Sequence, residues 1–514
     1  MMSNSMDVLL LVLPLAAVGC GTAPAPVDPG EPECALTSSC QGEPPPEAIC
    51  LEHLAADRLD DGCGVFVSSA FFGGDDANPG TKDKPVGSLR RAIELARTGR
   101  GRVFACSDVF EEPVVLPSGV DLYGGFDCLI WERTADTITT GIYFRPEPVK
   151  LLVVEPAGAG DTGAADGVTT IDHVTLLAGI HIGIFIRSGT AVEFIRSEIE
   201  ASYGLGGRHG EKWPGMNRAP DGAHGMYGAD ACSAATVAGG PAVVNPCEGG
   251  IQSVGGKGGD GLPDGAGDGE DGDPVPTSNP DHHGQGGLGN RADGGCDGGF
   301  TGISGMWGDA GTPGAGIGRI TETGWEGDKA ADGSRGMPGQ GGGGGGGRRG
   351  GLAVCGVTSK GGAGGGSGGA GGCGGRGGRG GENGEPSIGI VALHAKLTVR
   401  DSVIATHAAG AGGDGGPPEE GGKGGRGAPG GAVGDGTWSC GGGSGGRGGD
   451  GGYGGPGRGG DSIGIAYLDE DQLTLEGVTY ELGPPGKGGT SWSHEGSAVT
   501  GEDGSVLETL HFLE

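Results

Sequence analysis

The triplet Ile-Gly-Ile occurs three times at the same place in a recurring unit, and this recurrence constrains the fold more than any other feature. The triplets begin at Ile182, Ile388 and Ile463. Each is followed by a second short apolar run, and long glycine tracts lie between the units. Short β-branched runs at a repeating period predict a stack of β-coils. The glycine tracts then read as loops inserted at one recurrent corner of that stack.

The length of one coil follows from two matching runs. Residues 169–176 align with residues 194–199, which places Ile171 and Ile195 24 residues apart. This is about one coil of a parallel β-helix. We therefore expect strands 182–199 and 387–404 to be adjacent despite the tract between them. We also expect one continuous apolar core that contains Ile182, Ile184, Ile195, Ile390, Val399 and Leu475.

The glycine tracts have a period of their own. Glycine accounts for 128 of the 514 residues, several times its average of about 7%. Residues 361–381 and 445–459 repeat every three residues, which suits a threefold extended helix of polyproline-II geometry. Neighbouring helices of this kind approach closely and exchange backbone hydrogen bonds. We favour ordered, polyglycine-II-like bundles, and the alternative is a flexible coil because glycine loses the most entropy on ordering.

The N-terminus predicts export. The apolar run 8–18 is too short to span a bilayer and fits the core of a signal peptide. The sequence Ala-Val-Gly-Cys that ends at Cys20 is similar to the lipobox of bacterial lipoproteins, so we expect lipidation of Cys20. Residues 1–19 are then the signal peptide and 20–33 a Pro-rich tether. An outer-membrane lipoprotein exposed at the cell surface follows, with a lipid anchor as its contact with the membrane; an ordinary secretory signal is the alternative.

Cysteine usage agrees with export. The chain has 13 cysteines, and those other than Cys20 are even in number and lack the CxxC spacing of zinc sites. This pattern favours disulfides formed in an oxidising compartment over a metal site. The second glycine tract holds only Cys440, so we expect it to pair with a cysteine of the first tract. The disulfide candidates are Cys34, Cys40, Cys50, Cys63, Cys106, Cys128, Cys232, Cys247, Cys296, Cys355, Cys373 and Cys440.

The remaining organisation follows from composition. Within the first apolar stretch, Ser88 is positioned to cap a helix over residues 85–98 with an apolar stripe. The predicted parts are a Cys-bearing segment (34–62), the N-terminal β-helix (63–204), glycine-rich insert 1 (205–385), a β-helix coil (386–410), glycine-rich insert 2 (411–460), and a final coil with a C-terminal cap (461–514).

A family resemblance rests on five short stretches. They are Cys-Gly-Val-Phe-Val at 63–67, the turn 75–85, the helix 88–96, Val-Phe-Ala-Cys at 103–106 and Leu-Tyr-Gly-Gly-Phe-Asp-Cys at 122–128. Together they resemble bacterial lipoproteins that carry a right-handed parallel β-helix of the pectate-lyase-like superfamily and PE-PGRS-like glycine tracts. The resemblance covers roughly residues 63–200. It implies an all-β, right-handed solenoid with an N-terminal capping helix and a cell-surface setting, and it brings no established activity.

One acidic run offers the hard oxygen ligands that calcium prefers. It overlaps a single match to the calcium nonapeptide at residues 255–263. The alternative is a solvated acidic loop, and we expect no other cofactor. The candidate calcium ligands are Asp260, Asp264, Asp268, Glu270 and Asp271.

The coils carry no recognisable catalytic set. Polysaccharide hydrolysis needs clustered carboxylates, and Ser367 and Ser444 match a nucleophile elbow without its strand–turn–helix context. We interpret four aligned charged residues as a surface charge ladder and not as a catalytic row: Asp172, Arg196, Arg400 and Glu476. We therefore predict no catalytic residues and no enzyme, and a polysaccharide-active lyase or hydrolase is the alternative.

The aromatic residues of the glycine-rich segments suggest a ligand. Aromatic rings on a small-residue scaffold can stack on sugars, although they can also fasten loops to the coils. The net charge of −33 repels phosphate backbones, so nucleic acid is not an expected partner. We predict a structural, adhesive or polysaccharide-binding surface protein whose partner is a polysaccharide, a matrix component or another cell surface. An ice- or calcium-binding protein is a second alternative. The candidate ligand-binding residues are Trp213, Trp307, Trp325, Trp438 and Tyr453.

Overall fold

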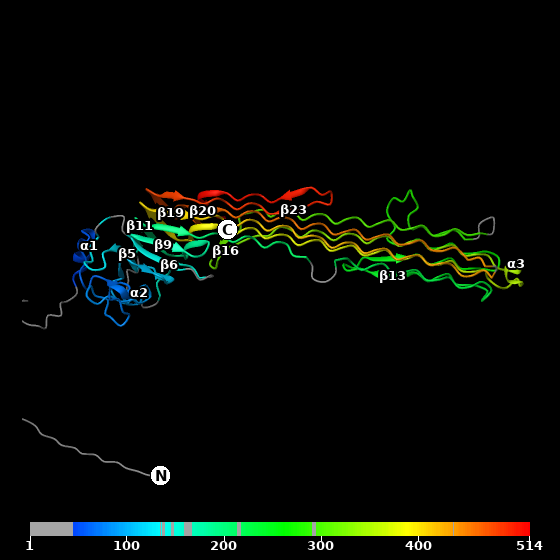
Figure 1. The fold of residues 1–514 in the computed structure, drawn as a ribbon, viewed down its shortest axis with the longest axis horizontal. Coiled ribbons are helices and arrows are strands. Elements are labelled where there is room, and N and C mark those ends of the chain that lie inside the picture. Colours follow the sequence, from blue (N-terminus) through cyan, green and yellow to red (C-terminus); the bar gives the residue numbers. More distant parts are fainter. Residues whose placement is uncertain are drawn as a thin grey trace, which may run out of the picture. The chain divides into compact units, whose positions relative to one another are not determined.

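Three parallel β-sheets hold most strands of the computed structural model (Figure 1). The structure describes residues 45–513 apart from 134, 136–138, 145–148, 159–166, 213–216, 290–294 and 435. We name the three parallel sheets A, B and C. From β8 (Thr169–Asp172) onward the chain passes through A, B and C in turn and then returns to A, so each circuit adds one strand to each sheet. The predictions for signal peptide 1–19, tether 20–33, Cys20, Cys34, Cys40 and Trp213 lie outside the described residues.

The members of each sheet are as follows. Sheet A contains β1 (Val65–Val67), β2 (Arg102–Cys106), β5 (Asp121–Phe126), β8 (Thr169–Asp172), β11 (Ala191–Ile195), β18 (Lys396–Arg400) and β21 (Leu473–Glu476). Sheet B contains β3 (Val109–Phe110), β6 (Thr140–Phe144), β9 (Val174–Ala178), β12 (Glu198–Ala201), β19 (Val403–Thr406) and β22 (Thr479–Glu481). Sheet C contains β4 (Val114–Pro117), β7 (Leu152–Glu155), β10 (Ile182–Ile186), β17 (Ser387–Ala392), β20 (Ser462–Tyr467) and β25 (Val506–His511).

The three Ile-Gly-Ile triplets lie side by side in sheet C. Ile184 pairs with Ile390, and Ile390 pairs with Ile465, so the triplets are in register on β10, β17 and β20. A methyl group added at Gly183 would lie 2.5 Å from the carbonyl oxygen of Gly389. The central glycine therefore permits the close approach of neighbouring strands. The predicted adjacency of strands across the first glycine tract is confirmed.

The core confirms part of the predicted set and corrects the rest. Ile184, Ile390 and Val399 are fully buried in the main cluster. Ile182 is buried in a separate cluster on the outer face of sheet C. Ile195 is only partly buried, because Phe194 and not Ile195 pairs with Ile171 and fills the core. The repeat from β8 to β11 is therefore one residue shorter than predicted. Leu475, on the last strand of sheet A, is 37% exposed because no further strand follows it there.

Sheet C is covered on both faces. The residues of β10 and β17 are all buried, which explains their unbroken apolar sequences. The hairpin of β15 (Arg319–Thr321) and β16 (Gly324–Glu326), part of insert 1, packs Ile320 and Trp325 against the outer cluster.

The short helices and disulfides fasten the N-terminal part. Helix α2 (Leu89–Arg97) confirms the predicted helix, and the Ser88 side chain caps it by accepting a hydrogen bond from the Arg91 amide. Helix α1 (Glu47–Ala55) was not expected, and its Cys50 is bonded to Cys63. Cys106 is bonded to Cys128. Of the helices in the described part of the chain, including the single turn α3 (Leu352–Cys355), none has the length and apolar character needed to cross a bilayer.

The glycine-rich segments run alongside one another away from the sheets (Figure 1) and share backbone hydrogen bonds. We call the hydrogen-bonded segments within residues 204–385, 408–460 and 483–504 the glycine bundle. Successive amides of one segment point to three different neighbours. The Gly366 amide donates to Cys440, the Ser367 amide to Met226 and the Gly368 amide to Gly256. The same partners recur three residues later, as when Gly369 donates to Gly443, so the predicted period-three hydrogen bonding is present.

The glycine pattern of a segment follows the number of its covered faces. In the outer segment 299–314 glycine occurs every third residue, and the residues between are exposed. In 361–381 two of three positions are glycine. In Gly341–Gly347 every residue is glycine and every one is buried. There, methyl groups added at residues 342, 343 and 344 would lie 2.1, 2.0 and 1.9 Å from carbonyl oxygens of three different segments.

A third excursion joins the bundle. Residues 482–505, between β22 and β25, lie in the region predicted as a final coil and cap, and the excursion was not expected. Its Gly486 amide donates to Gly460, and its Gly489 amide donates to Gly457. The hairpin of β23 (Thr490–Trp492) and β24 (Ala498–Thr500) lies within it. All three excursions leave from the ends of neighbouring strands of sheet B.

Candidate functional site

Two of the predicted aromatic residues come together on the bundle through a histidine that was not predicted. The ring of Trp307 stacks on His494, with centroids 4.7 Å apart. Tyr453 meets the same imidazole edge-on at 5.8 Å. Trp307 belongs to the first insert, Tyr453 to the second, and His494 to the turn between β23 and β24. Each excursion therefore supplies one ring of this aromatic cluster.

The bundle holds these rings by backbone and side-chain contacts. The Gly311 amide donates to the carbonyl of Tyr453 at 2.8 Å, which fixes the first two segments against each other. His494 Nε2 lies 3.1 Å from the carbonyl oxygen of Gly308, next to Trp307. Buried Ser491 donates to the Gly454 carbonyl at 2.6 Å and anchors the hairpin. The cluster is thus pre-organised by rigid neighbours, which lowers the entropic cost of binding.

The cluster presents an open aromatic face. Trp307 is 56% exposed although one side meets His494, and Met306 beside it is also exposed. An exposed indole offers a large flat surface with a polar edge, which suits stacking against the C–H face of a sugar ring. Beside Trp307, the Gly308 amide donates a hydrogen bond to the backbone carbonyl of Asp450. The Asp450 side chain is paired with Arg447.

Trp325 lies in a different place, beside a groove of about 540 Å³ at the base of the bundle. Its Nε1 donates to the Ile317 carbonyl at 2.8 Å, and its ring packs against the outer cluster of sheet C. The groove also contains the ion pair between Arg208 and Glu382 at 3.3 Å. Trp325 therefore fastens the hairpin to the sheet and also borders a charged groove. Fastening of loops was the alternative interpretation of the aromatic residues.

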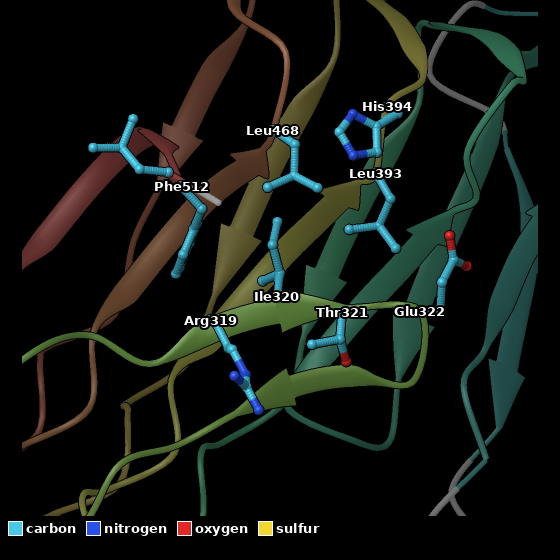
Figure 2. A pocket seen from close by; sticks show the side chains of 9 residues that line it. Arg319, Ile320, Thr321, Glu322, Leu393, His394, Leu468 and Phe512 are labelled. Atoms are coloured by element: carbon cyan, nitrogen blue, oxygen red, sulfur yellow. The ribbon is translucent and has the colours of Figure 1, made fainter.

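A pocket of about 320 Å³ lies at the other side of this hairpin. Figure 2 shows Ile320 pointing from the hairpin toward Leu393 and Leu468 at the ends of two strands of sheet C. The hairpin turn is held by Lys150, which donates to Thr323 at 2.9 Å, and by Ser188, which donates to Glu322 at 2.8 Å. The pocket is the open end of an apolar contact between hairpin and sheet.

Trp438 stands apart from the other aromatic residues. It is 56% exposed in the loop that joins the two long segments of insert 2. In the described part of the chain, no ring contact involving Trp438 is found. Its exposure equals that of Trp307, which makes it a matched comparison.

Three of the predicted calcium ligands each accept a hydrogen bond from a different backbone amide. Asp260 accepts from the Gly239 amide, Asp268 from the Gly289 amide and Asp271 from the Gly286 amide, each within 2.9 Å. Among the described residues, no group of three or more His, Cys, Asp or Glu side chains is placed to hold a metal ion. The structure therefore does not gather three of these carboxylates into one site. Asp264 and Glu270 lie on the same acidic stretch.

The predicted surface charge ladder forms ion pairs along sheet A, but its Asp172 is buried and not at the surface. Arg196 contacts Asp172 at 3.0 Å, and Arg400 contacts Glu476 at 3.0 Å. Burial alone would raise the pKa of Asp172, but the hydrogen bond with His173 and the guanidinium groups of Arg133 and Arg196 lower that pKa overall. These ion pairs join neighbouring strands of sheet A.

Ser367, the serine of the first nucleophile-elbow match, has a structural role. Ser367 is fully buried in the bundle, and its hydroxyl accepts a hydrogen bond from the Met226 amide at 2.8 Å. Ser444 lies on the segment that contains Tyr453.

All cysteines of the two inserts are paired. Cys232 is bonded to Cys355, Cys247 to Cys373 and Cys296 to Cys440. The last bond confirms the predicted link between the inserts.

Comparisons with protein-family models, with curated proteins and with solved structures find no match to this chain. The site must therefore be interpreted from its own residues.

Proposed function

We propose that this chain is an exported surface protein that binds polysaccharide without catalysis, through the aromatic cluster of Trp307, Tyr453 and His494. The observation that carries the proposal is the stacking of half-exposed Trp307 on His494, at a point where three separate excursions converge. A flat aromatic surface on a rigid support is the feature that sugar rings require. The partner is a glycan of a matrix or of another cell surface.

The architecture we propose for this role is a right-handed parallel β-helix that carries a polyglycine-II-like bundle. The cyclic order of strands through three parallel sheets supports the solenoid. The period-three exchange of hydrogen bonds with several neighbours supports the bundle. Such a bundle has few large side chains, so it displays its rare aromatic residues at defined positions.

The setting we propose is the outer surface of the cell, with Cys20 as a lipid anchor. Five disulfides support an oxidising compartment. The net charge of −33 disfavours nucleic acid and polyanionic glycans. Replacement of Cys20 by serine should release the protein from the membrane fraction, and equal membrane retention of C20S and wild type would count against the anchor.

A glycan array tests the binding role. The purified protein should bind a subset of uncharged polysaccharides, and Trp307→Ala should reduce that binding at least tenfold. Trp438→Ala, which removes an equally exposed but unstacked indole, should leave binding unchanged. An equal effect of both substitutions would overturn the cluster as the site. Release of reducing ends from the bound glycan would instead identify a polysaccharide-active enzyme.

A further inference from the structure

A further pocket lies on the outer face of sheet B, where the first two inserts leave the strands. Its volume is about 500 Å³, within the range of small-ligand sites. Tyr143, Leu177 and Glu200 line it as direct neighbours in one row across β6, β9 and β12. Tyr203 and His407, which follow β12 and β19, complete the wall.

The polar side chains of this pocket position one another by direct contacts. The ring of Tyr203 stacks on the imidazole of His407, with centroids 4.5 Å apart and planes 14° apart. His407 Nε2 lies 2.6 Å from Glu200 Oε1. Tyr203 is nevertheless 61% exposed. Since His407 covers one face of the phenol ring, the exposed area includes its other face.

The backbone on both sides of the pocket is also fixed. The Ser387 hydroxyl donates to the carbonyl of Ser202 at 2.7 Å and accepts a hydrogen bond from the His407 amide at 3.2 Å. One buried side chain therefore links the residue before Tyr203 to His407. The two loop residues that form the wall are positioned without a ligand.

We propose that Glu200, Tyr203 and His407 form a second saccharide-binding site, which takes uncharged or amino sugars and rejects uronates. The open face of Tyr203 stacks on the sugar ring. The Glu200 carboxylate, oriented by His407, accepts hydrogen bonds from sugar hydroxyl groups, and bonds to a charged acceptor are the stronger kind.

Charge around the pocket sets the preference among sugars. Glu200 and Glu481 flank Ala405 in one row of sheet B, and Glu198 is exposed on the same face. A sugar carboxylate placed here would face like charges, which raises the cost of its binding. An amino sugar would gain from the same carboxylates.

This site does not depend on the aromatic cluster of the bundle, because the two share no residue. The experiment therefore uses the full-length protein with Trp307→Ala, in which only the pocket on sheet B remains. Calorimetry measures binding of three probes of equal length, which are cello-oligosaccharide, chitosan oligosaccharide and oligogalacturonate.

In that background we expect binding of the first two probes and at least tenfold weaker binding of oligogalacturonate. Tyr203→Ala should reduce affinity at least tenfold, and Glu200→Gln at least fivefold. Tyr227→Ala, which removes an exposed tyrosine of insert 1 outside this pocket, is the control and should have no effect. Absence of binding to all three probes, a preference for oligogalacturonate, or equal affinities of Y203A and Y227A would overturn the proposal. Thermal unfolding of each variant checks that it is folded.

Discussion

Cys296 and Cys440 form a disulfide that joins the two glycine-rich inserts across 144 residues of sequence. The bond is close to Gly366, whose amide donates to the carbonyl of Cys440 at 2.9 Å. The disulfide thus ties the start of the second insert's returning segment to Cys296, beside the outer segment 299–314, while the Gly366 hydrogen bond joins the same point to a more buried segment of the first insert. This covalent link bears directly on whether chains so rich in glycine stay ordered.

Removal of this disulfide should destabilise the bundle. The chain-entropy model gives about 4–5 kcal/mol for loops of this size. The double variant C296S/C440S should therefore unfold at lower denaturant concentration and exchange the amides of residues 440–455 faster than wild type. The double variant of Cys50 and Cys63 should not alter exchange in that segment. Unchanged protection of residues 440–455 in C296S/C440S would show that hydrogen bonds alone order the bundle.

The enclosed glycine tract should tolerate no side chain. A methyl group at Gly344 would lie 1.9 Å from the carbonyl oxygen of Lys257, whereas one at exposed Gly206 would meet its nearest atom at 3.6 Å. Overpacking of a filled interior typically costs about 1–3 kcal/mol and sometimes more. We expect G344A to lower the free energy of unfolding by about 3 kcal/mol and G206A to leave it nearly unchanged, as measured by chemical denaturation. Similar values for the two variants would mean that the tract is loosely packed.

Much of the fold could be predicted because its signals are local and repeated. The Ile-Gly-Ile triplets predicted the register of sheet C across a long insertion, since an apolar pattern repeats where equivalent strands lie side by side. The error of one residue in sheet A arose where Phe194 and Ile195 are both apolar, because pattern alone does not say which of them faces the core.

The aromatic cluster could be predicted only in part. Trp307 and Tyr453 were singled out as residue types, but their contact with His494 depends on three excursions that meet far from their strands. The third excursion was missed because its glycines are interrupted by the hairpin at 490–500. The pocket at Tyr203 and His407 left no sequence signal, because the two residues are brought together by the pairing of β12 with β19 across the first insert.

One substitution should weaken the packing of the β15–β16 hairpin on sheet C. Ile320 is 6% exposed and packs on the outer cluster of the sheet, whereas Ile303 of the same insert is 44% exposed. Truncation of a buried isoleucine to alanine typically costs about 2–5 kcal/mol. We expect I320A to lower stability by about 2–3 kcal/mol and to raise the binding of a hydrophobic dye, and I303A to do neither. A dye response equal in both variants would show that the hairpin does not cover the sheet.

Stability should fall as pH rises from about 4 to 6 because of Asp121. Burial raises the pKa of this carboxyl from 3.8 to about 6, although the Thr170 amide, the Tyr123 hydroxyl and Arg102 oppose the shift. A raised pKa means that the folded state binds more protons than the unfolded state between these pH values. The free energy of unfolding contributed by this group therefore decreases across that interval and is lowest above pH 6.

Replacement of Asp121 by asparagine removes this penalty and keeps an oxygen for the Thr170 amide, which donates to it at 2.8 Å. We expect the free energy of unfolding of D121N to exceed that of wild type by on the order of 2 kcal/mol at pH 7.5, since one pKa unit corresponds to about 1.4 kcal/mol. The difference should shrink toward pH 4, as measured by denaturant unfolding at each pH. Exposed Asp221, replaced in the same way, should leave the profile of wild type unchanged. A D121N protein less stable than wild type at pH 7.5 would show that the ionised carboxylate is needed for its contacts with Tyr123 and Arg102.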